Sequence, residues 1–463
     1  EAGIGITFTE RIKAGSGNVT LRLVGAAGTV VENFGVGSSV TINNNLITID
    51  PTANLEADTV YHLSYPSGAF TNTSGDVSYV GTAYTFATKP LIPAFYMWGM
   101  NWHGSIPMGY VSDNNVNYSS PVQLPGTTWS AFSNHNRYGS VLGKKTDNTL
   151  WAWGYNGNGA LGLNNRTYYS SPVQIPGTTW KNLMAGPSSM ATKTDNTLWV
   201  WGYNYSGELG QNNRIYRSSP TQIPGTNWDK VGTASESGMA TKTDGTLWTW
   251  GNNFSGQLGL NQQAQTPSVV CIYISSPTQV PGTNWNYISA MDKVKMATKT
   301  DGTLWVWGRS NYGVLGQNAV SGGSRSSPVQ IPGTNWVKVS CGGQYNGYAT
   351  KTDGTLWAWG RQSNDDAGGR LGQNTSVDQS SPVQIPGTNW HTTSFVAGGT
   401  YGGAGLFMKT DGTLWSWGGN GYGSLGQNSN VSYSSPVQIP GEWSTLSDGN
   451  STGESQSAAI KYI

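Results

Sequence analysis

The sequence predicts an all-β protein in which a β-sandwich precedes a tandem-repeat propeller or array. A Trp-Gly pair recurs at steps of roughly 50 residues, a period typical of such repeat folds. An Asp-Gly or Asp-Asn hairpin signal stands ahead of most of these pairs. The N-terminal stretch contains no Trp and alternates apolar with polar residues, as short strands do. The Trp-Gly pairs begin at Trp98, Trp153, Trp201, Trp250, Trp307, Trp359 and Trp417.

One repeat copy, running from Thr243 to Gly251, shows the local chemistry. The residue after Asp is Gly245 here and is Gly or Asn in the other copies, which indicates a hairpin position with positive φ. Each hairpin leads into Leu-Trp-x-Trp-Gly, and both Trp side chains share one face of a strand because the strand period is two. Burial of one Trp removes roughly 150–250 Å² from water. We therefore assign these residues to the core and give them no chemical role.

The second half of each copy predicts an outer strand. A Gly-rich turn ends in Leu-Gly, a variable segment follows, and Ser-Ser-Pro then leads to Pro-Gly and a closing Trp. Because Pro is excluded from central ladders, we place the Ser-Ser-Pro segment in an edge strand or a loop. Two copies carry insertions, at 261–274 and 361–370, and insertions of this kind map to loops, often on a binding face.

These residues resemble the regulator-of-chromosome-condensation repeat, whose copies read approximately Asp-Gly-x-x-Trp-x-Trp-Gly-x-Asn-x-x-Gly-x-Leu-Gly. The copy from Asp244 through Trp250 to Gly259 matches this pattern closely, and the resemblance covers residues 95–463. It implies a seven-bladed β-propeller with four strands per blade. It implies little about function, because one fold hosts many activities.

The two ends of the repeat region are expected to complete the seventh blade together. The propeller begins at residue 95 without a preceding hairpin, and 457–463 matches the strand that precedes the hairpin in other copies. We expect Ile460 and Tyr462 to pair beside Tyr96 and Trp98. This closure would leave no free sheet edge.

Residues 1–89 are predicted to form an immunoglobulin-like β-sandwich. Short alternating runs, such as Val19 to Leu23, are separated by turn signals rich in Gly and Asn. The runs Ile6–Glu10 and Leu55–Tyr61 resemble bacterial immunoglobulin-like domains of the surface-layer type. That resemblance implies a spacer or attachment module of a cell-surface or phage protein. Asn72 stands where the family's loop has Asp, so the ion site of that loop is not carried over.

The boundaries of this first domain lead to two further expectations. The family usually begins with an additional strand ahead of the one predicted at Gly3–Phe8, and Glu1 lies only a few residues before it. We expect that strand to come from sequence upstream of Glu1 or, less favoured, from another subunit by strand addition. Residues 90–94 are predicted to be a linker stiffened by Pro.

The composition favours surfaces made of neutral hydrogen-bonding groups. Charged residues make up 11% of the chain and the net charge is +1, so there is no electrostatic case for nucleic acid or an anionic membrane. No apolar run approaches the roughly 20 residues of a transmembrane helix, so we expect no membrane insertion. Cys271 and Cys341 do not make a disulfide framework.

No motif predicts catalysis, a metal or a cofactor. Gly157-x-Gly159-x-x-Gly162 matches a dinucleotide fingerprint, but that fingerprint needs a following helix, and a Ser-Ser-Pro segment follows instead. The four His share no ligand spacing, and the one carboxylate pair of note is Asp365-Asp366. We therefore expect a protein that is not an enzyme and uses no cofactor. Carboxylates brought together from different blades would form a site without any sequence motif.

One Lys recurs in each blade and predicts a ring. The ring either forms an anion-binding rim, or each Lys faces solvent or the Asp two residues further on. The second alternative is favoured, because exposed ion pairs are common and weak. The ring consists of Lys145, Lys193, Lys242, Lys299, Lys351, Lys409 and Lys461.

The Gly-rich turns carry aromatic residues next to amides, and blade symmetry places all seven turns on one face. Aromatic rings beside neutral hydrogen-bonding groups suit a sugar or a protein surface. The alternative is that the rings merely brace the turns. The candidate binding residues are Trp102, His103, Tyr155, Tyr203, Tyr205, Phe254, Tyr312 and Tyr422.

The leading functional hypothesis is a non-enzymatic structural or adhesion protein, extracellular, on a virion or a bacterial cell surface. Residues 1–89 would bind virion or surface-layer subunits, and the propeller face would bind glycan or a host surface protein. One alternative is a guanine-nucleotide exchange or chromatin-binding propeller, which predicts a basic face. The other is a glycan-active enzyme, which predicts convergent carboxylates.

Overall fold

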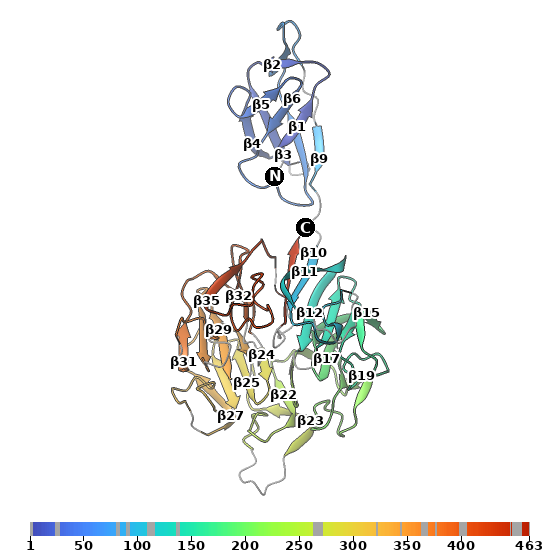
Figure 1. Cartoon of the computed structure of the whole chain (residues 1–463), viewed down its shortest axis with the longest axis vertical. Coiled ribbons are helices and arrows are strands. Elements are labelled where there is room, and N and C mark those ends of the chain that lie inside the picture. The colour runs from blue at the N-terminus through green and yellow to red at the C-terminus, as the bar shows by residue number, and fades with distance from the viewer. Residues whose placement is uncertain are drawn as a thin grey trace. The chain divides into compact units, whose positions relative to one another are not determined.

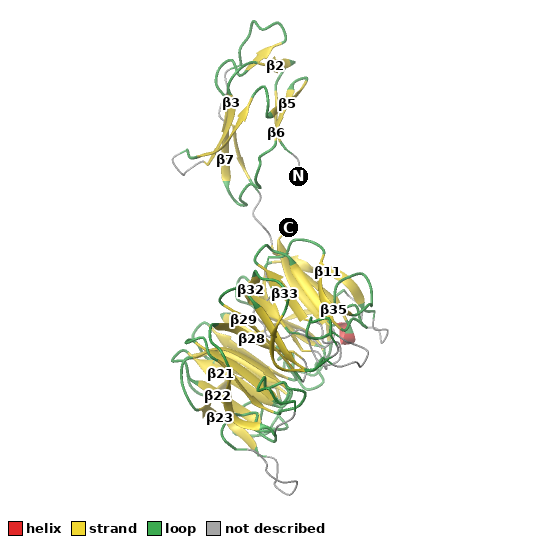
Figure 2. Ribbon diagram, turned by 90° about the vertical axis from the view of Figure 1, so that its left-hand side faces the viewer, coloured by secondary structure: helices red, strands yellow, loops and turns green. Residues whose placement is uncertain are grey.

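The computed structural model divides into two compact units, Glu1–Ile92 and Pro93–Ile463, and each is described by itself (Figure 1). Strands dominate both units, and a single short helical turn, η1 (Trp102–Gly104), occurs among the described residues (Figure 2). The insertion residues Cys271, Asp365 and Asp366 fall outside the described part. The structure describes residues 3–23, 28–79, 84–88, 93–108, 116–135, 139–262, 272–320, 323–342, 345–362, 369–375, 377–397, 405–444, 446 and 456–462.

The first unit is a sandwich of antiparallel sheets, as predicted. Strand β1 is an edge of its sheet, in register with β6 from Ile4–Ile49 to Thr7–Leu46. The source of an additional strand therefore stays a prediction. One sheet has the order β1 (Ile4–Thr7), β6 (Leu46–Ile49), β5 (Val40–Asn43); the other has β4 (Val30–Gly35), β3 (Asn18–Leu23), β7 (Val60–Ser64), β9 (Tyr84–Ala87); β2 (Ile12–Ala14) pairs with β8 (Phe70–Asn72).

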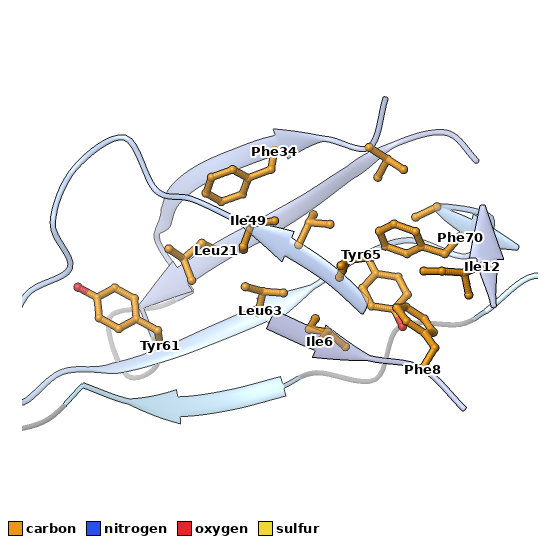
Figure 3. Close-up of a cluster of buried hydrophobic side chains, with 14 residues drawn as sticks. Ile6, Phe8, Ile12, Leu21, Phe34, Ile49, Tyr61, Leu63, Tyr65 and Phe70 are labelled. Carbon is orange, nitrogen blue, oxygen red and sulfur yellow. The ribbon is translucent and has the colours of Figure 1, made fainter. Parts of the chain in front are cut away.

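The core of the sandwich follows from strand alternation. Val19 and Leu21 are fully buried while Thr20 between them faces outward, where its hydroxyl donates to Asn33 Oδ1 over 2.8 Å. Aromatic rings close one end of this core, with Phe8 and Phe70 centroids 5.4 Å apart (Figure 3). The remaining core side chains drawn there include Phe34, Ile49, Leu63 and Tyr65.

Asn72 has a local structural role in its loop. Its Oδ1 accepts hydrogen bonds from the backbone N–H groups of Gly75, at 2.8 Å, and Val77, at 3.2 Å. An Asn side chain that satisfies nearby backbone donors stabilises a tight turn. The amide at this position is therefore engaged by the loop itself.

Seven antiparallel sheets form the second unit, which confirms the predicted propeller. In each of blades 1 to 6, the strand that begins at the closing Trp is followed by the two hairpin strands, and the Ser-Ser-Pro strand forms the edge, as predicted. Blades 1 to 3 are β12 (Trp129–His135), β13 (Ser140–Lys145), β14 (Leu150–Gly154), β15 (Tyr169–Ile175); β16 (Trp180–Met184), β17 (Ser188–Lys193), β18 (Leu198–Gly202), β19 (Arg217–Ile223); β20 (Trp228–Ala234), β21 (Ser237–Lys242), β22 (Leu247–Asn252), β23 (Tyr273–Val280).

The remaining blades repeat this order, and the last one joins segments from both ends of the unit (Figure 1). Blades 4 to 7 are β24 (Trp285–Met291), β25 (Val294–Lys299), β26 (Leu304–Gly308), β27 (Arg325–Ile331); β28 (Trp336–Gly342), β29 (Asn346–Lys351), β30 (Leu356–Gly360), β31 (Gln379–Gln384); β32 (Trp390–Val396), β33 (Gly405–Lys409), β34 (Leu414–Gly418), β35 (Tyr433–Ile439); and β36 (Gln456–Tyr462), β10 (Pro93–Gly99), β11 (Tyr118–Thr127).

The hairpin of each repeat is held by a three-residue hydrogen-bond chain. In blade 1, Asp147 Oδ1 accepts from the Thr149 backbone N–H at 2.9 Å and its hydroxyl at 2.7 Å, and the Trp151 indole donates to that hydroxyl oxygen at 2.9 Å. The Thr149 bonds hold the pKa of Asp147 below its ordinary value. The residue after Asp has the expected positive φ, 61° at Asn148 and 77° at Gly245. The same chain recurs at Asp195, Asp244, Asp301, Asp353 and Asp411.

The lysine ring has a different role from either alternative expected above. The Lys351 ammonium lies 4.6 Å from the ring centre of Trp336 and 4.4 Å from that of Trp357. The same double contact occurs in the other blades from Lys145 to Lys409. Because the ring face of an indole attracts a cation, these lysines brace the tryptophans of their own blade. The neighbouring Asp instead accepts its hydrogen bonds from Thr.

Neighbouring blades are joined by the second Trp of each Leu-Trp-x-Trp-Gly. Trp201 is fully buried, and its indole N–H donates over 2.8 Å to the carbonyl of Ala160 in the loop of the preceding blade. The equivalent bond occurs at all seven blade junctions. A second bond joins the Asn164 N–H to the carbonyl of Ser218 in the next Ser-Ser-Pro strand, over 2.7 Å. The repeated sequence therefore specifies both the blade and its junction.

The seventh blade is closed by pairing of β36 with β10. The two strands pair as expected, but the residues opposite Tyr96 and Trp98 are Ala459 and Ser457. Ile460 lies opposite Phe95 and Tyr462 opposite Pro93, so the expected partners are corrected. The expected linker also needs correction, because Pro93 and Ala94 already belong to β10. Residues 89–92 lie outside the described part of the chain.

The position before Leu-Gly contains one buried acid. In blade 2, Glu208 is fully buried, one carboxylate oxygen accepts from the Ser206 N–H at 2.6 Å, and the other has no hydrogen-bond partner. In blade 3, Gln257 occupies the same position and accepts from the Ser255 N–H at 2.7 Å. Burial raises the pKa of Glu208 to about 7. The fold therefore tolerates a neutral side chain better than a charged one here.

Deleting residues 456–463 is expected to lower the melting temperature by more than about 10 °C. The deletion removes β36, which pairs with β10 along its whole length, and so exposes the edge of β10. Differential scanning calorimetry measures this. The point variant Ile460→Asp, which buries an unpaired charge, should have an effect in the same direction, whereas Ile215→Asp, at an exposed loop position, should not. Unchanged melting of both closure variants would contradict the paired seventh blade.

Glu208→Gln should change the pH dependence of stability. Between the ordinary carboxyl pKa and about 7, the folded protein retains a proton that the unfolded chain loses. The free energy of unfolding of the natural protein therefore falls as pH rises through this window, by up to about 3 kcal/mol, and the Gln variant lacks this loss. Chemical denaturation at pH 4 and pH 8 measures the difference.

The reciprocal variant Gln257→Glu serves as the matched control. It should be close to the natural protein in stability at pH 4 and less stable at pH 8, because it introduces the same buried carboxyl in the next blade. If Glu208→Gln did not raise the free energy of unfolding at pH 8 relative to pH 4, the buried carboxylate would not be destabilising the folded protein.

Candidate binding surface of the propeller

The loops that follow the Trp-Gly pairs lie at one end of the blades. In blade 2, the Tyr203 N–H donates over 2.8 Å to the carbonyl of Pro187, which lies in the turn between the first two strands. In blade 4, the Arg309 N–H donates to Lys293 O at 2.9 Å in the same way. We call the surface formed by these two sets of loops the turn face. All eight candidate binding residues belong to the loops of this face.

The first aromatic group on the turn face spans the junction of blades 7 and 1. His103 lies in η1, and its ring centre is 5.3 Å from that of Tyr155 and 5.1 Å from that of Tyr168. The two Tyr rings are 4.9 Å apart. Trp102, next to His103, is 37% exposed and Tyr168 is 40% exposed. These side chains therefore present ring surface to solvent at one place.

The second group joins blades 2 and 3 through four Tyr and one Arg. The Arg214 guanidinium carbon lies 4.9 Å from the ring centre of Tyr205 and 4.7 Å from that of Tyr273, and its Nε donates to the Tyr205 carbonyl. Tyr203 stacks on Tyr205 at 6.3 Å and contacts Tyr216 at 4.9 Å. Burial, followed by the Tyr216 hydroxyl, raises the pKa of Tyr203 above its ordinary value, so its phenol stays neutral. Tyr205 is 53% exposed, which makes this cluster an accessible platform.

The third group lies between blades 4 and 5. Tyr312 and Tyr345 contact each other edge to face at 4.8 Å, and the Arg361 guanidinium lies 4.6 Å from the Tyr312 ring centre. Within the described part of the chain, no ring contact joins Phe254 or Tyr422 to another aromatic side chain. Both are exposed all the same.

The predicted residues therefore form three groups and two isolated positions rather than one continuous patch. The structure brings His103 together with Tyr155, and Tyr203 together with Tyr205. Sequence analysis missed the partners of these residues, although a signal for three of them was present. They occupy the position two residues before Ser-Ser-Pro, which is aromatic in blades 1 to 3 alone. The missed aromatic partners are Tyr168, Tyr216, Tyr273 and Tyr345.

Four of the amides next to the aromatics are held by their own loops, contrary to the expectation that they face a ligand. Asn156 is fully buried, and its Oδ1 accepts the backbone N–H of Leu161 over 2.9 Å. Asn204, Asn253 and Asn420 make the same bond in their own loops. These four loops engage the amides themselves, so the amide oxygens are not available to a ligand.

The acid whose pKa lies near neutrality is not part of the turn face. Glu208, whose pKa lies near neutrality, is fully buried and therefore out of contact with any ligand on the surface. No group of three or more His, Cys, Asp or Glu side chains able to hold a metal occurs among the described residues. No helix in the described part is long and apolar enough to cross a membrane.

Comparison with family models identifies both units. The model of the regulator of chromosome condensation (RCC1) repeat matches residues 147–184, 244–294, 301–348 and 411–451. The model of a bacterial Ig-like domain matches residues 1–88.

Sequence relatives cover part of the propeller. The human E3 ubiquitin-protein ligase HERC2 is 30% identical over 145 residues, which is 31% of this chain and 3% of the ligase. The mitochondrial RCC1 domain-containing protein RUG3 of Arabidopsis thaliana is 31% identical over 175 residues, or 35% of this chain and 37% of that protein. The chain thus spans a minor part of the length of these relatives.

Solved structures show the same fold over most of the chain. Yeast RCC1 (Prp20), solved with Kap60, has a TM-score of 0.67 at 18% identity, covering 81% of this chain and 89% of its own. Human WBSCR16 has a TM-score of 0.65 at 20% identity, covering 80% and 98%. Another structure, of Prp20p from Saccharomyces cerevisiae, is described with its binding to Gsp1p and histones. Together with the geometry above, these matches show that the chain combines an N-terminal bacterial Ig-like domain with a β-propeller of RCC1 repeats.

Proposed function

We propose that this chain is a non-enzymatic recognition protein whose turn face binds a glycan or a protein surface. The observation that carries the proposal is the Arg214 cluster, in which a guanidinium lies between two Tyr rings and one ring is half exposed. Aromatic and Arg side chains dominate binding energy at interfaces, because they offer a large rigid contact area with polar edges. A flat ring also stacks on the apolar face of a sugar.

The Ig-like domain supports the further proposal of an extracellular role on a virion or a bacterial cell surface. It resembles a bacterial spacer domain, and it would bind virion or surface-layer subunits while the propeller remains available to a target. The low charge of the whole chain agrees with recognition by neutral groups and ring faces.

A second candidate function is protein binding of the kind named for Prp20p, whose structure is described with Gsp1p and histones. The observation in its favour is the shared propeller fold at 18% identity. Fold likeness at this level leaves the binding residues open, since one fold carries many functions. The glycan-active alternative predicts convergent carboxylates, and the pair of note, Asp365-Asp366, lies outside the described residues.

The double variant Tyr205→Ala/Tyr273→Ala should lose target binding while keeping the fold. We expect the labelled natural protein to bind either a defined subset of the glycans on a printed array or intact bacterial cells. The variant should bind at least about tenfold more weakly, because truncation of each interface aromatic typically costs more than 1 kcal/mol. The array signal and the binding isotherm on cells measure this.

Tyr84→Ala provides the matched control, since Tyr84 is comparably exposed but lies in the Ig-like unit. Loss of cell binding without any array signal would identify a protein target on the same face. Equal binding by the turn-face variant and the natural protein, with the melting temperature preserved, would show that the turn face is not the binding surface.

A further inference from the structure

Two pockets of the same construction lie at neighbouring blade junctions of the propeller. The pocket between blades 4 and 5 has a volume of about 400 Å³, and the pocket between blades 3 and 4 has a volume of about 410 Å³. Both volumes are within the range of roughly 300–1,000 Å³ that is typical of small-molecule sites. We call them the junction pockets. None of the eight candidate residues of the turn face lines either of them.

Each junction pocket is assembled from corresponding positions of two blades. The preceding blade contributes an Asn and a Pro, which are Asn318 and Pro332 in one pocket and Asn261 and Pro281 in the other. The following blade contributes two Trp, one Lys and a Ser-Pro pair of its edge strand. These residues are Trp336, Lys351, Trp357, Ser381 and Pro382 in one pocket and Trp285, Lys299, Trp305, Ser327 and Pro328 in the other.

Two indole rings orient one ammonium group in each pocket. Between blades 3 and 4, Lys299 Nζ lies 4.6 Å from the ring centre of Trp285 and 4.9 Å from that of Trp305. Lys351 makes the same double contact in the other pocket. Ring faces attract a cation without supplying a full negative charge. The rings therefore fix the position of the ammonium group and leave its charge to be matched by another group.

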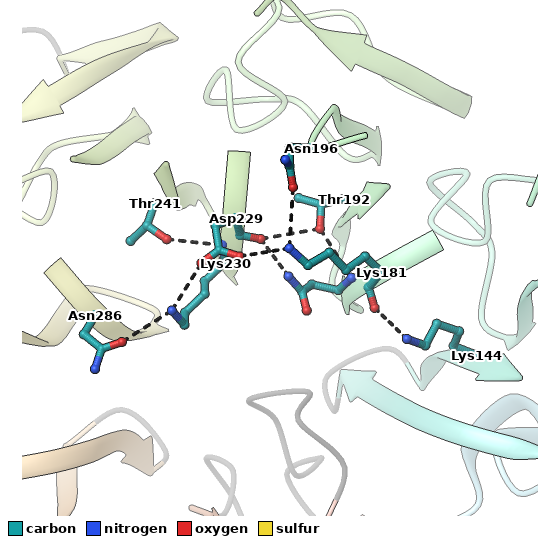
Figure 4. Close-up of polar contacts among 9 residues, drawn as sticks. Lys144, Lys181, Thr192, Asn196, Asp229, Lys230, Thr241 and Asn286 are labelled. Carbon is teal, nitrogen blue, oxygen red and sulfur yellow. Dashed lines mark hydrogen bonds and ion pairs between the residues drawn. The ribbon is translucent and has the colours of Figure 1, made fainter. Parts of the chain in front are cut away.

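No carboxylate forms an ion pair with Lys299 or Lys351 among the described residues. The ion pairs in that part of the chain involve Lys181 and Lys230, each 3.2 Å from a carboxylate oxygen of Asp229 (Figure 4). Asp353, in the hairpin after Lys351, accepts hydrogen bonds from the Thr355 hydroxyl and backbone N–H. These bonds are the main cause of the lowered pKa of Asp353, and attraction to Lys351 is a smaller cause. A closer anionic partner for the ammonium group would come from a ligand.

Around the ammonium group, the pocket walls combine apolar rings with neutral polar groups. Trp357, Pro332 and Pro382 retain exposed surface where they line one pocket. In the other pocket, the Ser327 hydroxyl donates to Asn261 Oδ1 over 3.2 Å, which places a hydroxyl and an amide side by side. A sugar ring has an apolar face of C–H groups and a rim of hydroxyl groups, and such a wall complements both.

Other occupants match the junction pockets less well. The edge strands at the two pockets contain Pro382 and Pro328, and proline has no N–H with which to pair an added peptide strand. A neutral sugar would leave the ammonium groups without an anionic partner. A sugar residue that carries a carboxylate matches the rings, the neutral polar groups and the ammonium group together.

We propose that each junction pocket binds one carboxylate-bearing sugar residue. The lysine ammonium group pairs with the carboxylate, and the Trp and Pro rings cover the apolar face of the sugar. One ammonium group per pocket matches one carboxylate per sugar residue. Two such pockets on one propeller also favour an oligomer of acidic sugars over a single residue, because the second contact is intramolecular. These sites are separate from the turn face, and a turn-face target without acidic sugars leaves them empty.

The indole N–H signals of the full chain, labelled with ¹⁵N at tryptophan and assigned by Trp→Phe replacements, report on each pocket separately. Methyl glucuronide represents a uronic acid and sialyllactose a sialic acid, and methyl glucoside and lactose are the matched neutral probes. We expect saturable shifts of Trp305 and Trp357 with at least one acidic probe, and at least about tenfold weaker binding of its neutral counterpart. The stronger acidic probe identifies the class of sugar.

Three results of this titration would overturn the proposal. They are unchanged Trp305 and Trp357 signals with both acidic probes, equal affinity for acidic and neutral probes, and a shift confined to Trp102. The last result would assign acidic sugars to the turn face, where Trp102 is exposed.

Lys351→Gln tests the location, with the second pocket of the same molecule as its matched control. The variant should weaken binding between blades 4 and 5 at least about tenfold, measured by the Trp357 signal, because the carboxylate loses its charged partner. Trp305 should keep its full response. Lys299→Gln should have the reverse effect on the two signals.

Asn318→Asp tests the charge while Lys351 keeps its contacts with the rings. Asn318 is exposed with a φ of 57°, a conformation that Asp also tolerates. The added carboxylate should repel the probe and weaken binding at Trp357 several-fold, more so at low salt. Melting temperatures check the folding of both variants, and Asn318→Asp alone decides if Lys351→Gln fails to fold. An undiminished Trp357 response in the folded variants would show that the junction pocket is not the site.

Discussion

The propeller depends on one interaction repeated at every blade junction, the hydrogen bond from a fully buried indole to a carbonyl of the preceding loop. The second Trp of Leu-Trp-x-Trp-Gly fills the space between two sheets, and its N–H would be unsatisfied without this carbonyl. Gly at the Leu-Gly turn makes the contact possible. At Gly162, φ is 70° and an added Cβ would lie 2.9 Å from the indole nitrogen of Trp201. The Leu-Gly signature is therefore a consequence of the junction rather than of the loop alone.

The remaining features of each blade support this junction. The first-strand Trp packs on both indoles of the hairpin strand, and the lysine ammonium lies over two of these rings. In the loop that follows the hairpin strand, the buried amide of Asn156 is already engaged by the backbone of its own loop. The loops of the turn face, in contrast, differ between blades in both sequence and length. The aromatic binding site proposed above lies in these loops.

Much of the fold could be predicted from the sequence, because every copy of the repeat contains the same local signals for hairpin, core strand and edge strand. The hairpin φ values, the buried Trp face, the edge position of the Ser-Ser-Pro strand and the alternation around Val19 all follow from local rules. The partners of Ile460 and Tyr462 in β10 were predicted incorrectly, because no local signal fixes the register of β36. The contact of the repeated lysines with tryptophan rings was missed, because we considered only charged groups as partners of a lysine.

The sites were less predictable, because they depend on residues that meet across blades. The aromatic positions of the turns were identifiable, but their partner Tyr216 lies just before the edge strand of the blade and their partner Tyr273 belongs to the next blade. The sequence suggested that Asn204 contacts a ligand, but its Oδ1 accepts the backbone N–H of Leu209 in its own loop. The ion pair between Lys181 and Asp229 joins two neighbouring blades, and no local pattern in the sequence predicts it.

The central claim is that the turn face recognises the target while the blades act as a rigid frame. Hydrogen–deuterium exchange of the full chain, alone and bound to target cells or their isolated surface polymer, tests it most directly. The account predicts new protection in the loops 155–168 and 203–216, with unchanged exchange in the Ser-Ser-Pro strands. Protection confined to those outer strands or to the Ig-like unit, with exchange of the turn-face loops unaltered, would contradict it.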